Sequence, residues 1–89
     1  MANTTLNRNT VGVASASDKQ ADLVSKVRTV IGAGELRAVR IRANLSLSDI
    51  GQVIGVEPST VLRWERGASP RWSNAVRLGT LLTRLADGQ

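Results

Sequence analysis

Apolar residues recur at intervals of three and four positions along most of the chain, the spacing of one buried helical face. The first such stretch predicts a helix over 18–31, which the sequence GAG at 32–34 brings to an end. Ser17 and Gln20 form a capping-box pair at its start. The apolar stripe of this helix is wide and comprises Ala21, Leu23, Val24, Val27, Val30 and Ile31.

Two further helices are predicted from the same spacing. A helix over 35–43 should end at Asn44, which is a plausible C-terminal cap. Its apolar face comprises Leu36, Val39 and Ala43, with Arg40 on the same stripe. A helix over 71–86 carries its apolar side chains at Ala75, Leu78, Leu81, Leu82 and Leu85.

Two short helices between these are marked by their ends. Ser46 opens the first with a second capping box, since Asp49 follows three residues later, and Gly55 ends it. Pro58, a residue favoured at the first helical position, opens the second, which ends at Gly67. The buried face of the first is expected to contain Ile50 and Ile54, with Leu47 and Val53 in part.

The fold class predicted from these elements is all-α, a small five-helix bundle. No stretch shows the sustained alternation of a half-buried strand, and no internal repeat is present. Residues 1–16 are polar, small and aperiodic, so we expect a disordered or weakly ordered N-terminal tail there. The helical domain is expected over 17–89.

The spacing around Gly55 satisfies a helix-turn-helix, which constrains seven positions. Counted from Leu47, the fifth residue must be small where the helices cross, and it is Gly51. The ninth must tolerate a left-handed backbone, and it is Gly55 itself. The other five must pack inward, and all are apolar: Ile50, Ile54, Val56, Val61 and Trp64. A helix-turn-helix is therefore predicted over 47–66.

The segment LSLSDIGQVIGVEPSTVLRWERG, residues 45–67, resembles the core of the lambda repressor/Cro-like (XRE-type) helix-turn-helix family. Upstream, LRAVRIRANLS resembles the first core helix of that family. The similarity covers roughly residues 35–85, and WERG is its most specific part. It implies a small helical DNA-binding domain whose second short helix, the recognition helix, enters the major groove.

The chain departs from the family pattern in several places. The family often has glutamine where Leu47 stands and alanine where Gly51 stands. Glycine inside a helix costs about 1 kcal/mol relative to alanine, so a softened helix is expected. The usual fifth helix after the core is not recognisable, and the helix over 18–31 is an addition. Its stripe should pack on its own domain or form part of a dimer contact.

The resemblance implies two sets of DNA-contacting residues. The base-reading candidates are Pro58, Ser59, Thr60 and Arg63. The phosphate candidates are Arg37, Ser46, Leu47, Arg66 and Arg71. Glu65 resembles an acidic residue that pairs inward with an arginine of the first core helix, here Arg40. The competing interpretations are solvated surface arginines and plain helix capping by the hydroxyl residues.

Three other side chains bear on the same surface. Trp64 and Trp72 are expected in the core rather than as platforms for base stacking. Glu57 stands where the family usually has a small polar residue near a phosphate. It could accept a hydrogen bond from cytosine or repel the DNA backbone, and both interpretations stay open.

Composition narrows the chemistry. The 89 residues include no cysteine and no histidine, which excludes disulfides, thiolate nucleophiles and histidine-based zinc or acid–base sites. No paired catalytic constellation is visible, so we expect no enzyme and no cofactor. The net charge is +5, and ten of the twelve basic residues are arginine, which suits phosphate and guanine. A GC-rich genome would explain the same excess of arginine over lysine.

We therefore expect a sequence-specific transcriptional regulator of double-stranded DNA, a phage or prophage repressor of the Cro type. Such proteins bind inverted-repeat operators as homodimers. The alternatives are an antitoxin-type autorepressor, the DNA-binding half of a larger repressor, and a protein-interaction module that keeps the fold without DNA binding. No apolar run is long enough to span a membrane, so a cytoplasmic, nucleoid-associated protein is expected, in the host cytoplasm if phage-encoded.

Overall fold

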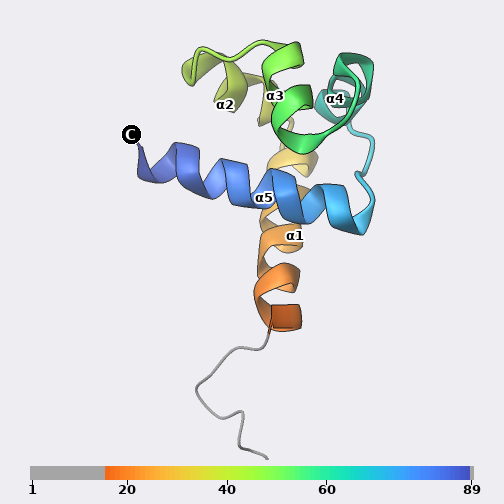
Figure 1. Cartoon of the computed structure of the whole chain (residues 1–89), viewed down its shortest axis with the longest axis vertical. Helices are drawn as coiled ribbons and strands as arrows, with labels where there is room; N and C mark the ends of the chain where they lie inside the picture. Colours follow the sequence, from red (N-terminus) through yellow and green to blue (C-terminus); the bar gives the residue numbers. More distant parts are fainter. Residues whose placement is uncertain (1–15, 89) are drawn as a thin grey trace, which may run out of the picture.

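Five helices follow one another along the chain in a computed structural model that describes residues 16–88 (Figure 1). They are α1 (Ala16–Gly32), α2 (Leu36–Arg42), α3 (Leu47–Ile54), α4 (Pro58–Glu65) and α5 (Trp72–Asp87). This stretch contains no strand, so the prediction of an all-α five-helix bundle is confirmed. Within the same stretch, none of the helices has the length and apolar character needed to cross a bilayer.

The first helix begins earlier than the sequence predicted. Ala16 is already helical, so Ser17 lies inside α1 and does not cap it. The spacing of a capping box can occur by chance within a polar helical turn, and here the chain continues as helix through it. The predicted tail lies outside the described residues except for Ala16.

Helices α1 and α5 cross steeply in contact with each other (Figure 1). At the crossing, a Cβ added to Gly79 would lie 2.7 Å from the Leu23 carbonyl oxygen and 2.8 Å from the Leu23 Cβ. Glycine is therefore required here for the two backbones to approach so closely. The approach buries Val24, Val27 and Ile31 of the α1 stripe, so much of that stripe packs on its own chain.

All five helices contribute to one hydrophobic core. Helix α5 supplies the largest share, and Leu78, at its centre, is fully buried. Around it lie Val24, Val27 and Ile31 of α1, Leu36 of α2, Ile50 and Ile54 of α3, Val61 and Trp64 of α4, and Ala75, Leu81 and Leu82 of α5. The helix-turn-helix and the added helix α1 therefore share a single core.

Two core predictions were wrong. Val53 was expected to be partly buried, but it is 56% exposed. At 3.6 residues per turn, it lies about 100° around α3 from Ile54 and about 60° from Ile50, to one side of the face that they form. Trp72 is 49% exposed because it is the first residue of α5, before that helix reaches the core. Its indole Nε1 donates a hydrogen bond of 3.4 Å to the Gln20 Oε1.

The α2–α3 connection turns on Asn44, which has a left-handed backbone with φ 62°. Its N–H donates to the Ile41 carbonyl, and the N–H of Leu45 donates to the Arg40 carbonyl. These bonds satisfy carbonyls that the end of α2 would otherwise leave unpaired, and asparagine tolerates this conformation better than most residues. The turn directs the chain into the N-terminus of α3.

Candidate nucleic-acid interface

Helices α3 and α4 pack against each other through a tight turn that depends on Gly51. A Cβ at this position would lie 2.5 Å from the carbonyl oxygen of Val56. The Gly51 carbonyl in turn accepts hydrogen bonds from the N–H groups of Gly55 and Val56, at 2.7 and 2.9 Å. Glycine has a lower helix propensity than alanine, but the turn leaves no room at this position for the alanine that is common in the family.

The inward positions of the helix-turn-helix lie as the spacing predicted. Ile50, Ile54, Val61 and Trp64 are buried, and Val56 is partly buried against the same core. Gly55 has the left-handed backbone required at the turn, with φ 93°. The unit is therefore a packed helix-turn-helix, with the opposite face of α4 left to the solvent.

Helix α5 holds the turn in place through Arg77, a residue that the sequence analysis missed. Its Nη1 donates a hydrogen bond of 2.9 Å to the carbonyl of Ile54, the last residue of α3. The carbonyls at a helix C-terminus lack partners within the helix and carry partial negative charge, so an arginine suits this place. No local pattern points to this contact, because the two residues are 23 positions apart.

Replacing Arg77 with methionine should remove this hydrogen bond while keeping the aliphatic stem. We expect the free energy of unfolding to fall by about 0.5–1.5 kcal/mol, the usual net contribution of one such bond. Urea denaturation followed by circular dichroism measures the change. Arg77→Lys, which retains a donor, is the matched control and should lose less. An unchanged midpoint in Arg77→Met would show that the contact does not stabilise the turn.

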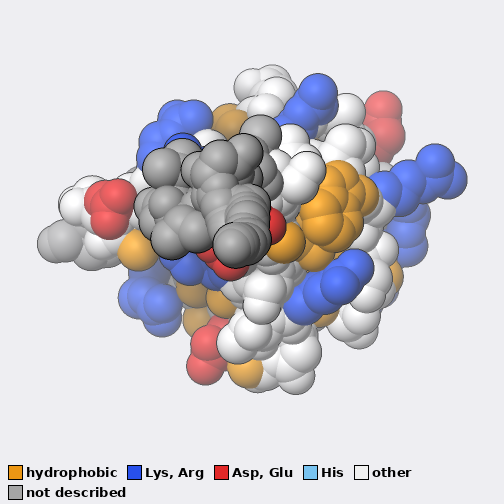
Figure 2. Space-filling model, turned by 90° about the horizontal axis from the view of Figure 1, so that it is seen from below, with side chains coloured by type: hydrophobic (Ala, Val, Ile, Leu, Met, Phe, Trp, Pro, Cys, Tyr) orange, Lys and Arg blue, Asp and Glu red, His pale blue; other side chains and the backbone are white. Residues whose placement is uncertain are grey.

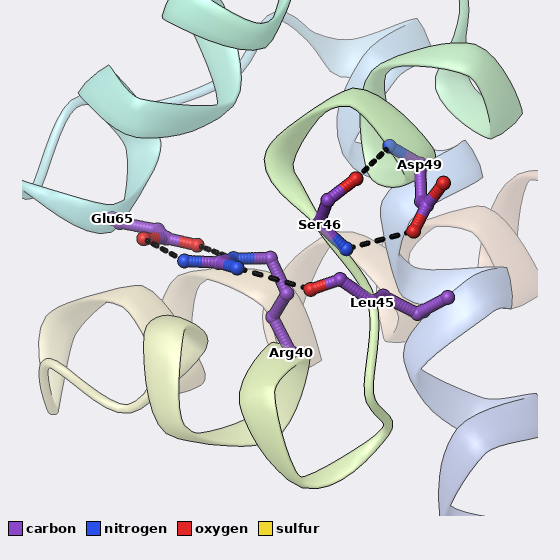
Figure 3. A network of polar contacts seen from close by, with 5 residues as sticks. All are labelled: Arg40, Leu45, Ser46, Asp49 and Glu65. Atoms are coloured by element: carbon purple, nitrogen blue, oxygen red, sulfur yellow. Dashed lines mark hydrogen bonds and ion pairs between the residues drawn. The ribbon is translucent and has the colours of Figure 1, made fainter.

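Arg40 and Glu65 join α2 to α4 (Figure 3). The Arg40 Nε and Nη2 donate to the two carboxylate oxygens of Glu65, the latter at 3.2 Å, so the pair is bidentate. The Arg40 Nη1 also donates to the Leu45 carbonyl at 3.0 Å. The side chains are 12% and 3% exposed. The hydrogen bond with Glu65 raises the pKa of the Arg40 guanidinium, against the lowering effect of burial.

The outward face of α4 carries the base-reading candidates. Pro58, Ser59 and Arg63 are exposed, and Thr60 is partly buried. The Arg63 Nη2 donates a hydrogen bond of 3.2 Å to the Thr60 hydroxyl, one turn back along the helix. The charges of α4 are therefore divided, since Glu65 is paired on the inner side while Arg63 lies on the surface.

The N-terminus of α3 holds two of the phosphate candidates, Ser46 and Leu47. Ser46 donates its N–H to the Asp49 carboxylate at 2.8 Å and accepts the Asp49 N–H at 2.9 Å (Figure 3). Hydrogen bonding from Ser46, first of all from its backbone N–H, lowers the pKa of the Asp49 carboxyl below its ordinary value. Both polar groups of Ser46 are thus engaged. The Leu47 amide is one of the first-turn N–H groups that have no partner within the helix.

The three arginines among the phosphate candidates come from different elements. Arg37 lies on α2, Arg66 caps the C-terminus of α4, and Arg71 precedes α5. All three are exposed, and over residues 16–88 no ion pair holds any of them. No side-chain hydrogen bond in that range joins them to one another or to the base-reading candidates. The backbone N–H of Arg66 donates to the Arg63 carbonyl at 3.1 Å where α4 ends. Seen from the side opposite α2–α4, basic and acidic side chains are interspersed (Figure 2).

A shallow hollow between α3 and the start of α4 adds two residues that the sequence analysis missed. It is lined by Ser48, Gly51, Gln52, Gly55, Val56, Glu57 and Pro58. Ser48 and Gln52 are exposed and four residues apart, so they share one face of α3 beside the recognition helix. A polar pair at this spacing on the first helix of the unit is the signal that could have identified them. Glutamine can bind adenine through two hydrogen bonds.

A short helix with an exposed polar face, packed across a tight turn on a second helix, is the arrangement of the helix-turn-helix class, a motif typical of DNA-binding proteins. Comparison with known families matches residues 33–87 to the helix-turn-helix domain family, and the chain belongs to that family. The assignment agrees with the resemblance to lambda repressor/Cro-like proteins. All of α1 lies outside the matched residues. Searches of curated proteins and of solved structures gave no match.

Proposed function

We propose that this protein is a sequence-specific transcriptional regulator that binds double-stranded DNA with α4 in the major groove. The observation that carries the proposal is the division of α4 into two faces. Val61 and Trp64 are buried and Glu65 is paired inward, whereas Ser59 and Arg63 lie on the surface. Only the outer face is available to a partner, and a helix of this size fits the major groove.

The residues of that face have complementary roles in the proposal. Arg63 binds guanine or an adjacent phosphate, because its planar guanidinium can donate two parallel hydrogen bonds. To do so it leaves the hydroxyl of Thr60, which is then able to contact DNA together with Ser59. Pro58 offers apolar contact to a thymine methyl group. Position on the duplex is set by the phosphate candidates Arg37, Arg66 and Arg71, the Leu47 amide and Ser46.

The proposed operator is an inverted repeat bound by two copies of the chain. A single recognition helix contacts few base pairs, and two-fold pairing doubles the site, with half-site centres about one helical turn apart. A phage or prophage repressor of the Cro type is the form of regulator we favour, and an antitoxin-type autorepressor is the alternative.

A second candidate function is a protein-interaction module that retains the fold without binding DNA. Two carboxylates favour it, since Asp49 lies in the first turn of α3 and Glu57 immediately precedes α4. Both would lie near the phosphates of a bound duplex and oppose binding. Selection of bound sequences from a random duplex pool, followed by titration at several salt concentrations, distinguishes the two. DNA binding requires an enriched site and affinity that falls steeply with salt.

Replacing Arg63 with alanine should weaken binding to the selected duplex by about 1–3 kcal/mol and relax preference at one base pair per half-site. The physical reason is the loss of its paired hydrogen bonds to one base. Gel-shift titrations against the selected site and its single-base variants measure both effects. Arg28→Ala, which removes an exposed arginine from α1, is the charge-matched control. Equal affinity and equal preference in Arg63→Ala would identify Arg63 as a solvated charge.

A further inference from the structure

A cleft lies between α1, α2 and α5, and none of the DNA-contacting candidates lines it. Its volume is about 180 Å³. It is lined by Lys26 and Val30 of α1, Val39, Arg42 and Ala43 at the end of α2, and Leu82, Leu85 and Ala86 of α5. This volume is below the roughly 300–1,000 Å³ of pockets that hold drug-sized ligands, so the fitting occupant is a smaller organic molecule.

The lining combines an aliphatic interior with positive charge. Leu82 is buried, and Val30, Val39 and Leu85 are partly buried hydrophobic residues packed on the core. The two charged residues of the lining, Lys26 and Arg42, are both basic and exposed. The Lys26 Nζ donates to the Thr83 hydroxyl at 3.1 Å, which holds it over α5. Arg42 forms no ion pair with any residue in the described part of the chain.

We propose that this cleft binds a small amphipathic carboxylate, a molecule with a short aliphatic body and one acidic group. The aliphatic body replaces water against Val30, Val39 and Leu85, a favourable transfer for each apolar surface covered. The carboxylate accepts hydrogen bonds from the guanidinium of Arg42 and from the remaining donors of Lys26, and charge-assisted bonds of this kind are the stronger ones. The basic pair selects an anion over an alcohol or an amine of the same shape.

The cleft is connected to the recognition helix through α2. Val39 and Arg42 form one wall, and Arg40, between them in sequence, is bonded to Glu65 at the end of α4. A molecule seated against α2 therefore contacts the helix that braces α4. A carboxylate bound in the cleft would therefore be placed to act as an effector of a DNA-binding regulator. Binding of the carboxylate itself does not require DNA.

The test uses the full chain without DNA, so its result is independent of the proposed function. Hexanoate is titrated into the isotope-labelled protein, with 1-hexanol and hexylammonium as uncharged and cationic matches, and backbone amide shifts are recorded. Hexanoate should shift the amides of Val30, Val39 and Leu85 and bind about tenfold more tightly than either match. Arg42→Gln should lower the affinity for hexanoate about tenfold. Arg28→Gln removes an arginine that lies outside the cleft and should leave this affinity unchanged.

A second variant blocks the cleft without removing charge. Ala86 is exposed on α5, so Ala86→Leu is compatible with the helix, and its larger side chain should fill the space and abolish the hexanoate shifts. The proposal is overturned if hexanoate leaves the cleft amides of the native chain unshifted. Equal affinity for hexylammonium, or undiminished affinity in Arg42→Gln, overturns it as well.

Discussion

Replacing Val24 with aspartate should unfold the protein. Val24 is 2% exposed and lies where α1 packs on α5. A carboxylate there would lose nearly all of its water, and burying a charge in a packed core is among the most destabilising changes known. We expect the free energy of unfolding to fall by about 4 kcal/mol or more. The least stable small domains have a total free energy of unfolding of only about 5 kcal/mol, so this loss is enough to unfold the chain. Circular dichroism and urea denaturation measure it.

Ser25→Asp provides the matched control, because the neighbouring Ser25 is exposed and receives the same charge. This variant should stay within about 0.5 kcal/mol of the native chain, as is usual at surface positions. A Val24→Asp variant that stayed folded but lost self-association in the ultracentrifuge would contradict the packing of α1 on its own chain. The stripe would then be a dimer contact.

Removing one partner of the Arg40–Glu65 pair should have the second largest effect. Breaking a buried ion pair costs about 3–5 kcal/mol because the remaining charge is left without a partner. For Glu65→Gln we expect the lower end of this range, since the side chain of Arg40 retains 12% exposure. Arg40→Met should be at least as severe, because Glu65 is 3% exposed. Urea midpoints of the variants measure both losses.

The double variant Arg40→Met/Glu65→Gln completes a double-mutant cycle. The cycle distinguishes the energy of the interaction between the two residues from the effect of each substitution alone. If the residues interact, the double variant should be more stable than the sum of the single losses predicts, by a coupling energy of about 0.5–3 kcal/mol. Arg37→Met, one turn earlier on α2 and exposed, controls for loss of an arginine from this helix. A coupling energy near zero would mean that the pair does not join the two helices energetically.

Much of the fold could be predicted from the sequence because its signals are local. Capping residues and stopping glycines determine where short helices begin and end, and the structure places α3 over 47–54 as the box at Ser46 predicted. The errors arose where burial depends on tertiary packing and cannot be predicted from the apolar character of a residue alone. Apolar character favoured burial of Val53 and Trp72, but one lies beside the contact face and the other before the core begins.

The site was only partly predictable for the same reason. Periodicity separated the inward Trp64 from the outward Arg63 on one helix. It gave no sign of the bond from Arg77 to the Ile54 carbonyl, since that contact depends on how α5 crosses α3. The helix-turn-helix spacing predicted a small residue at Gly51, but it did not show that the carbonyl of Val56 in the following turn leaves room for glycine alone. These features depend on three-dimensional approach and have no sequence period.

The crossing of α1 over α5 has a consequence for the order in which the molecule assembles. It joins parts of the chain as far apart as Lys26 and Thr83, 57 residues, whereas α3 and α4 meet across a short turn. Closing the longer loop costs more chain entropy, so the helix-turn-helix should form before α1 docks. During synthesis α1 is made before α5. Its apolar stripe must therefore remain uncovered until α5 has been made, and in that interval the nascent chain is most exposed to aggregation.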